Sequence, residues 1–307
     1  MTEYLPRVRA AASPATLHTY NSYWDRMEHQ WGPRRLDEIT ATDVEALLRS
    51  LIASAVRRRN HRAGRNTGEN FICAARALYN RAIADGLINP TTSPAHRVAK
   101  PRRLPSTRRA LTDHELTQIY TAARTSGNDV ILDTLLLRLH IETAARRGGV
   151  LGLHLADLDT ELCVLLLREQ GGTVRWQPVS PSLTRALADH AACRGTVLPT
   201  DTLLRYRDGQ PLTSRRYDHL WHRLGNELPW IATQGISTHW LRHTTLTWVE
   251  RHFGYGIARS YAGHTDTTGA ATTTYIKASV QDVATALVAM TGEAHPLAHP
   301  TSSHGNT

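Results

Sequence analysis

Five side chains in the last two thirds of the sequence could act together on a phosphodiester. His239 and Arg242 lie three positions apart, so on a helix they would share one face. His264 follows in an Ala-Gly-His segment, and Tyr275 comes directly after three threonines. The fifth, Arg146, lies far upstream in a Thr-Ala-Ala-Arg-Arg-Gly-Gly segment. Two arginines, two histidines and a tyrosine can bind a phosphate group and attack it.

Each of these residue types suits one part of such a reaction. A guanidinium group stays charged, binds two phosphate oxygens at once and stabilises negative charge that builds on them. A tyrosine hydroxyl nearby is a suitable nucleophile. Attack on DNA would give a 3′-phosphotyrosyl bond, which conserves the phosphodiester energy for rejoining. This chemistry needs no metal and no cofactor. A zinc site at His239 and His243 is the alternative, but Trp240 stands where a metalloprotease has glutamate.

The charge distribution points to a polyanionic partner. The formal net charge is +9 over 307 residues. Residues 1–110 hold 19 basic and 9 acidic residues, a net of +10, whereas residues 111–307 hold 17 and 18, a net of −1. Such asymmetry is typical of a nucleic-acid-binding segment, and a merely solubilising surface is the alternative. Double-stranded DNA is therefore the expected partner.

Turn and capping signals divide the chain into four parts. Residues 1–100 show helical spacing after Ser13-Pro14 and after a capping box at Thr42 and Glu45. Residues 101–110 combine prolines with arginines and are expected to be a basic linker. Residues 111–292 are expected to form a second domain, opened by a capping box at Thr112 and Glu115. Residues 293–307, rich in His, Pro and Ser, are expected to be a disordered tail.

The second domain mixes helices with a few short strands. Helices are expected over 130–140, 180–191, 214–224, 238–253 and 280–290. Strands are expected over 163–167 and 174–179, because β-prone runs flank Gly171-Gly172, and a further short strand over 203–206. The predicted fold class is multidomain: an all-α first domain, then a mainly α (α+β) domain with a small β-hairpin sheet.

In this order and spacing, the motifs resemble those of the tyrosine recombinases, the phage integrases and Xer-type resolvases. The segment around Arg146 is similar to the box of the family's first catalytic arginine, and His239-x-x-Arg242 to its His-x-x-Arg box. Gly263-His264 matches the Gly-His box, and Tyr275 the nucleophile. The resemblance runs from about residue 13 to 292. It implies a SAM-like core-binding domain followed by a catalytic domain, which together clamp duplex DNA.

The sequence departs from the family pattern at two chemical positions. Gln170 occupies the place of the lysine that protonates the leaving 5′ oxygen in the family. Glutamine has no ionisable proton, and Arg168 or Arg175 would be a poor donor because arginine has a pKa above about 12. Gly149 stands where the family usually has a carboxylate, three residues after the arginine. The interval between His264 and Tyr275 is also about two residues longer than the resemblance leads us to expect.

Two functions follow from these observations. The first is an active site-specific recombinase or integrase that cleaves and rejoins DNA through Tyr275, slowly because of Gln170. The second is a DNA-binding relative that does not cut, with an architectural or regulatory role. Gln170 and Gly149 favour the second function, and the intact arginine, histidine and tyrosine boxes favour the first.

The resemblance also implies partners and a location. The expected phosphate contacts are arginines of the first domain and the linker: Arg57, Arg58, Arg59, Arg62, Arg65, Arg102, Arg103, Arg108 and Arg109. The family works as a tetramer on two DNA sites, and residues 280–290 would be the helix passed to a neighbour. No apolar run of about 18 residues is present, so no membrane span is expected. Three scattered cysteines suggest a reducing cytoplasm, and a DNA partner implies association with the nucleoid.

Overall fold

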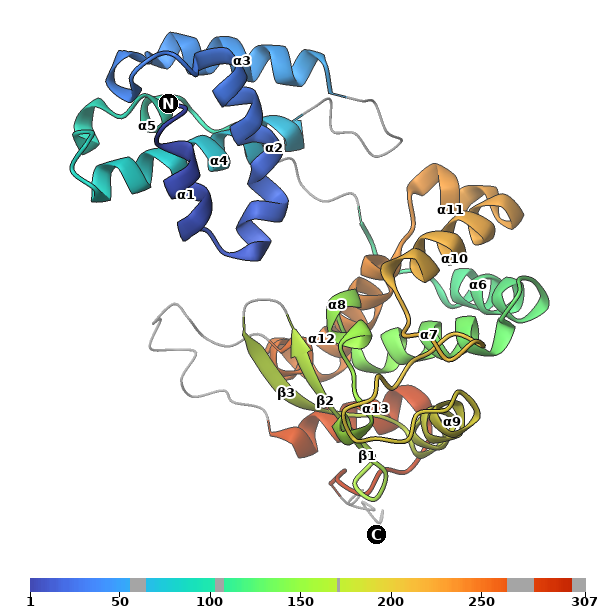
Figure 1. Ribbon diagram of the computed structural model, residues 1–307. Helices are drawn as coiled ribbons and strands as arrows, with labels where there is room; N and C mark the ends of the chain where they lie inside the picture. Colours follow the sequence, from blue (N-terminus) through green and yellow to red (C-terminus); the bar gives the residue numbers. More distant parts are fainter. Residues whose placement is uncertain (56–64, 103–107, 170–171, 264–278, 300–307) are drawn as a thin grey trace. The chain divides into compact units, whose positions relative to one another are not determined.

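The computed structural model describes residues 1–55, 65–102, 108–169, 172–263 and 279–299 (Figure 1). The chain divides into two compact units, Met1–Ser106 and Thr107–Thr307. The described part of the first unit is helical, and the second combines helices with one small sheet. The predicted fold class is therefore confirmed.

The first unit is a set of helices around an aromatic core. The four longer helices are α1 (Leu5–Ala11), α2 (Pro14–Trp31), α3 (Ala41–Ala53) and α4 (Arg65–Ala84). Short turns follow or separate them: η1 (Leu36–Glu38), η2 (Pro90–Thr92) and α5 (Pro94–Arg97). As predicted, the Ser13 side chain caps α2 by accepting a hydrogen bond from the backbone N–H of Thr16. The core includes the buried side chains of Trp24, Trp31, Met27, Phe71 and Tyr79.

Two details of the first unit differ from the prediction. Helix α1 was not expected from the sequence. The capping box of α3 consists of Thr40 and Asp43, two residues before the predicted pair of Thr42 and Glu45. Both pairs fit the same pattern, and Asp43 is further held by Arg34 at 3.0 Å. The sequence pattern could not include that third partner.

The second unit begins with α6, and its Thr112 and Glu115 form the predicted capping box. Its helices are α6 (Asp113–Thr125), α7 (Val130–Thr143), α8 (Arg147–Leu151), α9 (Pro181–Cys193), α10 (Ser214–Glu227), α11 (Pro229–Gln234), α12 (Thr238–Ala262) and α13 (Val280–Thr291). Helix α7 is buried along most of its length and packs against α6, α9 and α12. It is the central element of this unit (Figure 1). Helix α12 is longer than predicted and contains a kink at Gly254.

The sheet is a three-stranded antiparallel meander in the order β1-β2-β3. A 3₁₀ turn, η3 (Leu155–Asp157), leads into β1 (Leu158–Asp159), followed by β2 (Val164–Glu169) and β3 (Thr173–Pro178). The predicted hairpin is thus present. The strand expected over residues 203–206 is not: this stretch makes only an isolated bridge from Arg205 to Pro211. The chain turns at Gly209, so the stretch is too short to form a ladder of paired residues with another strand.

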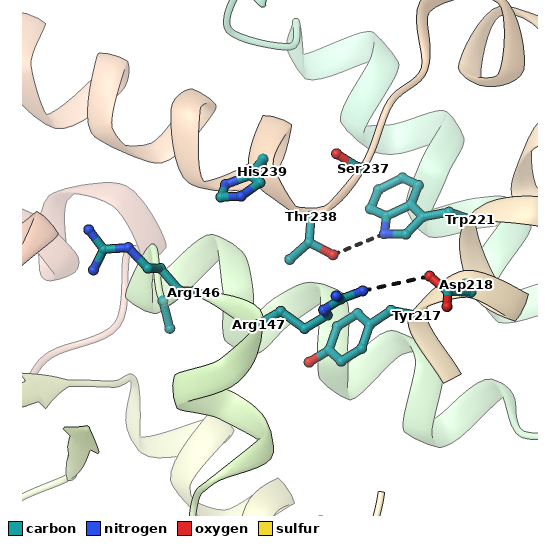
Figure 2. Close-up of a pocket in the computed structure, with 9 residues that line it drawn as sticks. Arg146, Arg147, Tyr217, Asp218, Trp221, Ser237, Thr238 and His239 are labelled. Carbon is teal, nitrogen blue, oxygen red and sulfur yellow. Dashed lines mark hydrogen bonds and ion pairs between the residues drawn. The ribbon is translucent and has the colours of Figure 1, made fainter. Parts of the chain in front are cut away.

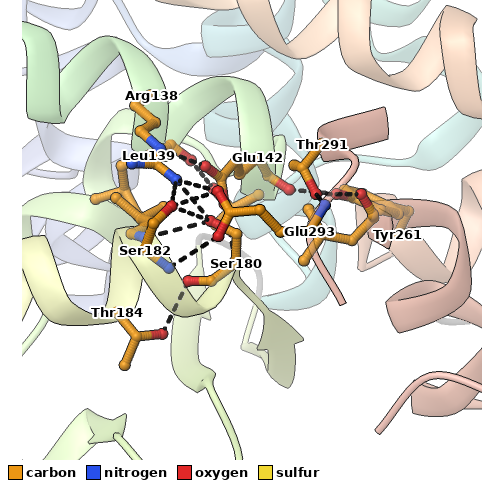
Figure 3. A network of polar contacts seen from close by, with 12 residues as sticks. Arg138, Leu139, Glu142, Ser180, Ser182, Thr184, Tyr261, Thr291 and Glu293 are labelled. Atoms are coloured by element: carbon orange, nitrogen blue, oxygen red, sulfur yellow. Dashed lines mark hydrogen bonds and ion pairs between the residues drawn. The ribbon is translucent and has the colours of Figure 1, made fainter. Parts of the chain in front are cut away.

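Helix α13 and the residues after it are fastened to their own domain. Helix α13 packs on α12 and β3. The Glu293 carboxylate then accepts hydrogen bonds from the Ser182 backbone at 3.0 Å and from Arg138 at 3.2 Å (Figure 3). His295 is buried, with Nε2 3.0 Å from the Cys163 carbonyl oxygen. Residues 293–299 therefore differ from the disordered tail that their composition predicted, because specific polar contacts hold them.

Candidate active site

Arg146 is positioned by a tight turn between α7 and α8. Ala144 ends α7 with a φ of 50°, a left-handed conformation that costs energy for a residue with a side chain. The turn makes Arg146 the residue that caps α8, so that its backbone and its side chain face β2. The Ala144 carbonyl oxygen accepts a hydrogen bond from Arg242 Nη1. The strained turn thus connects the two predicted arginines.

Arg242 and His239 lie in the first turns of α12. Arg242 is buried, and its Nη2 donates to the Ala262 carbonyl oxygen at 2.7 Å. Burial and the positive charge of Arg146 lower the pKa of Arg242 to about 10. The imidazole of His239 is exposed, but partial desolvation and the nearby charge of Arg108 lower its pKa. This shift favours the neutral form of the His239 imidazole.

Arg146 and His239 line one pocket of about 400 Å³ (Figure 2). Thr238 and Trp221 close one side of it through a hydrogen bond of 3.0 Å. Arg147, also in the wall, lies 3.6 Å from the Asp218 carboxylate. The pocket is therefore basic at its arginine end, where the Asp218 carboxylate lies beside Arg147, and presents the imidazole of His239 and the hydroxyl of Thr238 elsewhere. Such a lining suits one phosphate of a DNA backbone.

The buried carboxylate of Glu169 binds Arg146 through two hydrogen bonds. Glu169 ends β2, and its side chain is 0% exposed. One carboxylate oxygen accepts from the Arg146 backbone N–H at 2.5 Å, and the other from Arg146 Nη1 at 2.7 Å. Glu169 was not among the site residues predicted from the sequence. The available signal was strand alternation, because Glu169 shares a face with buried Leu167.

A third arginine, Arg175 of β3, joins the same cluster. It pairs with Leu167 across the hairpin and therefore projects from the same face as Glu169. Its Nη2 lies 3.3 Å from the Thr143 carbonyl oxygen and 3.9 Å from the Glu169 carboxylate. Burial lowers its pKa, and its Nε has no partner among the described residues. Arg175 is thus a buried cation with hydrogen-bonding capacity left over.

The other arginine of the hairpin, Arg168, lies on the opposite face. It projects between Leu167 and Glu169 in the alternation of β2 and is half-exposed. Its Nη1 contacts both carboxylate oxygens of Asp157, at 2.6 and 2.7 Å. Of the two arginines that could replace the missing lysine, the geometry therefore brings only Arg175 to the arginine cluster.

Gly263 makes the position of Arg175 possible. It ends α12 with a φ of +68°. A side-chain carbon there would lie 2.5 Å from Arg175 Nε, which is closer than atoms can approach. Gly263 directly precedes His264 in the sequence. The predicted Gly-His segment therefore begins beside the third arginine.

Several predicted site residues lie outside the described part of the chain. They are Tyr275, His264, Gln170, Arg57, Arg58, Arg59, Arg62 and Arg103, together with the side chain of Arg65. Arg102 and Arg108 are exposed. Arg109 is ion-paired with Glu115, at 2.5 Å, which neutralises part of its charge. The structure thus brings together Arg146, His239 and Arg242 of the predicted catalytic set.

None of the helices in the described ranges combines the length and apolar character of a membrane span. Within those same ranges, no three His, Cys, Asp or Glu side chains are grouped so that they could hold a metal ion.

Comparisons with known proteins identify the family of the chain and agree with its fold. The profile of the phage integrase family matches residues 109–281, more than half of the chain. The chain therefore belongs to the phage integrase family, the tyrosine recombinases. Among curated relatives, tyrosine recombinase XerD of Mycobacterium leprae is 28% identical over 242 residues, 74% of this chain and 73% of that protein. Tyrosine recombinase XerC of Listeria welshimeri is 26% identical over 60% of this chain and 62% of that protein.

Solved structures share the same fold. A lambda integrase tetramer bound to a Holliday junction superposes with a TM-score of 0.65 at 18% identity, covering 87% of this chain and 78% of that one. The Tn1549 transposon integrase, in complex with circular intermediate DNA, gives a TM-score of 0.66 at 17% identity, covering 90% and 94%. At these identities the likeness establishes the architecture, and the chemistry rests on the residues of the chain itself.

Proposed function

We propose that this protein is a site-specific DNA recombinase that cleaves and rejoins DNA through a 3′-phosphotyrosyl bond to Tyr275. The observation that carries the proposal is the convergence of Arg146 and Arg242 on one buried carboxylate, beside a pocket lined by His239. Arginines held in place in this way form a preorganised site for a phosphate that gains negative charge. Membership of the phage integrase family supports the same conclusion.

In the proposed reaction, the Tyr275 oxygen attacks the phosphorus and the bond to the 5′ oxygen breaks. Arg146 and Arg242 bind the non-bridging oxygens and stabilise the charge that develops on them. Neutral His239 can accept the tyrosine proton or donate a hydrogen bond to the phosphate. His264 would complete the set. The second attack, by a 5′ hydroxyl on the phosphotyrosine, rejoins the strand and frees Tyr275.

Protonation of the leaving 5′ oxygen is the weak step. Gln170 cannot supply a proton. Arg175 reaches the cluster, and burial shifts its pKa downward, although arginine remains a reluctant acid. We therefore propose that cleavage is slow and that Arg175 acts mainly by stabilising charge.

The experiment that tests this function uses duplex DNA nicked near the cut site. Cleavage of such a substrate releases a short fragment and traps the protein on the DNA, so a covalent adduct appears on a denaturing gel. Tyr275→Phe removes only the hydroxyl, so it should abolish the adduct while DNA binding persists. Adduct formation by Tyr275→Phe would refute the assignment. Binding without any adduct from the unchanged protein would favour the second function, a non-cutting DNA-binding protein.

The remaining parts of the proposal concern assembly and DNA contact. We propose that the protein acts as a tetramer on two DNA sites, since a relative in the same fold is a tetramer on a Holliday junction. The basic first domain and the linker would contact DNA phosphates, through Arg102 and Arg108 among the described residues. Arg109 is already ion-paired with Glu115, so part of its charge is neutralised. The expected location is the cytoplasm, at the nucleoid.

A further inference from the structure

Glu169 carries a charge that its surroundings must compensate. Its carboxylate is buried, and desolvation would strongly disfavour an isolated carboxylate in that position. Two hydrogen bonds from Arg146 account for much of the compensation. The carboxylate also lies 3.9 Å from Arg175 Nη2 and 3.9 Å from Arg242 Nη1. Three guanidinium groups therefore surround one carboxylate.

The three arginines would repel one another without this carboxylate. The charge of Arg146 helps to lower the pKa of both Arg175 and Arg242, whereas Glu169 raises both. With Glu169 the cluster has a net charge of +2, enough to bind a phosphodiester and its developing charge. Without Glu169 the side chain of Arg146, which is 30% exposed, has no described partner that keeps it in place. Glu169 thus fixes the geometry of the phosphate site.

Gly149 is the reason that Glu169 fits. A side-chain carbon at Gly149 would lie 2.9 Å from Glu169 Cγ, closer than such carbons approach in real structures. Gly149 lies on α8, three residues after Arg146. The resemblance to the tyrosine recombinases places a carboxylate at this position, where this sequence has glycine. The structure fills the resulting space with a carboxylate from β2.

We propose that Glu169 is the positioning residue of the arginine cluster. Glu169 and Gly149 then form an exchanged pair: β2 supplies the supporting carboxylate at Glu169, and α8 has a glycine where that carboxylate would otherwise be. This inference rests on the proposed function, because it concerns the site that would hold the scissile phosphate. Glu169 does not touch the substrate in this scheme. It acts through Arg146, Arg175 and Arg242.

The test is a cycle of four full-length proteins: unchanged, Glu169→Ala, Gly149→Glu and the double variant. Cleavage of the nicked duplex is measured at saturating protein, and DNA affinity is measured separately. Glu169→Ala should lower the cleavage rate by roughly 10²-fold, as a small misplacement of catalytic groups does. Its DNA affinity should stay the same or rise, because a negative charge is lost. The double variant should recover cleavage to within roughly tenfold of the unchanged protein.

A second measurement, the midpoint of urea unfolding, does not depend on cleavage. Gly149→Glu should lower the midpoint in the unchanged protein, where two carboxylates collide, and raise it in the Glu169→Ala background. An absence of this reversal would overturn the exchange. The reversal without recovery of cleavage would overturn the positioning role. If the unchanged protein forms no adduct, the proposed recombinase function fails, and the urea cycle alone then decides whether the carboxylate has moved.

Discussion

Arg175 and Arg168 offer a matched pair on one hairpin. Arg175→Ala removes a buried guanidinium from the proposed phosphate site, and loss of one such donor typically costs about 10²–10³-fold in rate. Arg168→Ala should leave cleavage at saturating protein nearly unchanged. It should instead lower the melting temperature, because Asp157, 3% exposed, loses its cation. Single-turnover cleavage and thermal unfolding of both variants check this division. Equal losses of cleavage would contradict it.

The glutamine at position 170 leads to a prediction about the leaving group. Gln170→Lys should accelerate cleavage by a factor within about 10²–10⁴, the usual worth of a general acid. A substrate with sulfur in place of the bridging 5′ oxygen provides the control. Its thiolate, with a pKa near about 8.5, leaves without a proton, so both proteins should cut it at similar rates. A persistent advantage of Gln170→Lys on the sulfur substrate would show that the lysine acts otherwise than as an acid.

At the scale of elements, the last turn of α7 makes stability depend on pH. His140 is buried between the Tyr217 hydroxyl, at 2.9 Å, and the Ala145 carbonyl oxygen, at 3.0 Å. Burial lowers its pKa to about 4. The unfolded chain takes up a proton near pH 6.5, but the folded protein does not. The contribution of His140 to the free energy of unfolding is therefore fully present above pH 6.5 and is lost as the pH falls from 6.5 to 4. His190 behaves in the same direction.

Urea unfolding at pH 7 and pH 5 measures this effect. Each of the two histidines should contribute a loss of about 2 kcal/mol over that interval, since one pKa unit corresponds to about 1.4 kcal/mol. His140→Gln should reduce the pH dependence, although it lowers stability at pH 7. Exposed His222→Gln serves as the control and should leave the dependence unaltered. Because His190 still titrates, about half of the dependence should remain in His140→Gln, and a dependence that is not reduced would mean that His140 is not responsible for its share.

The sequence predicted the elements whose signals are local. Ser13 and Thr112 begin helices where expected, and the hairpin around Gly172 is present. Short elements without a strong signal were missed or misplaced, such as α1 and the capping box at Thr40. Motif spacing predicted Arg146, His239 and Arg242 as site residues, and the structure places them close together. Glu169 could not be identified in this way, because its role depends on a contact across 23 residues and on the absence of a side chain at Gly149.

At the scale of the whole molecule, the uneven charge predicts how DNA binding responds to salt. The fragment 1–110, with a net charge of +10, should bind duplex DNA with a steep negative salt dependence. Replacing a phosphate-contacting arginine, for example Arg58→Gln, should reduce the log–log slope by roughly 0.9. Titrations at several salt concentrations measure the slope. A DNA affinity that does not change with salt concentration would mean that the basic residues only face solvent.

The surroundings of Gly263 limit which substitutions can accumulate in this sequence during evolution. Gly292 has a similar left-handed backbone, with a φ of +73° and nothing within 4 Å of the missing side chain, so asparagine could replace it at modest cost. Gly263 faces two separate obstacles, the backbone conformation and the guanidinium of Arg175 at 2.5 Å. A tolerated replacement at Gly263 would therefore require a second change at position 175. In a deep mutational scan, substitutions at Gly263 should be tolerated only in combination with a substitution at position 175.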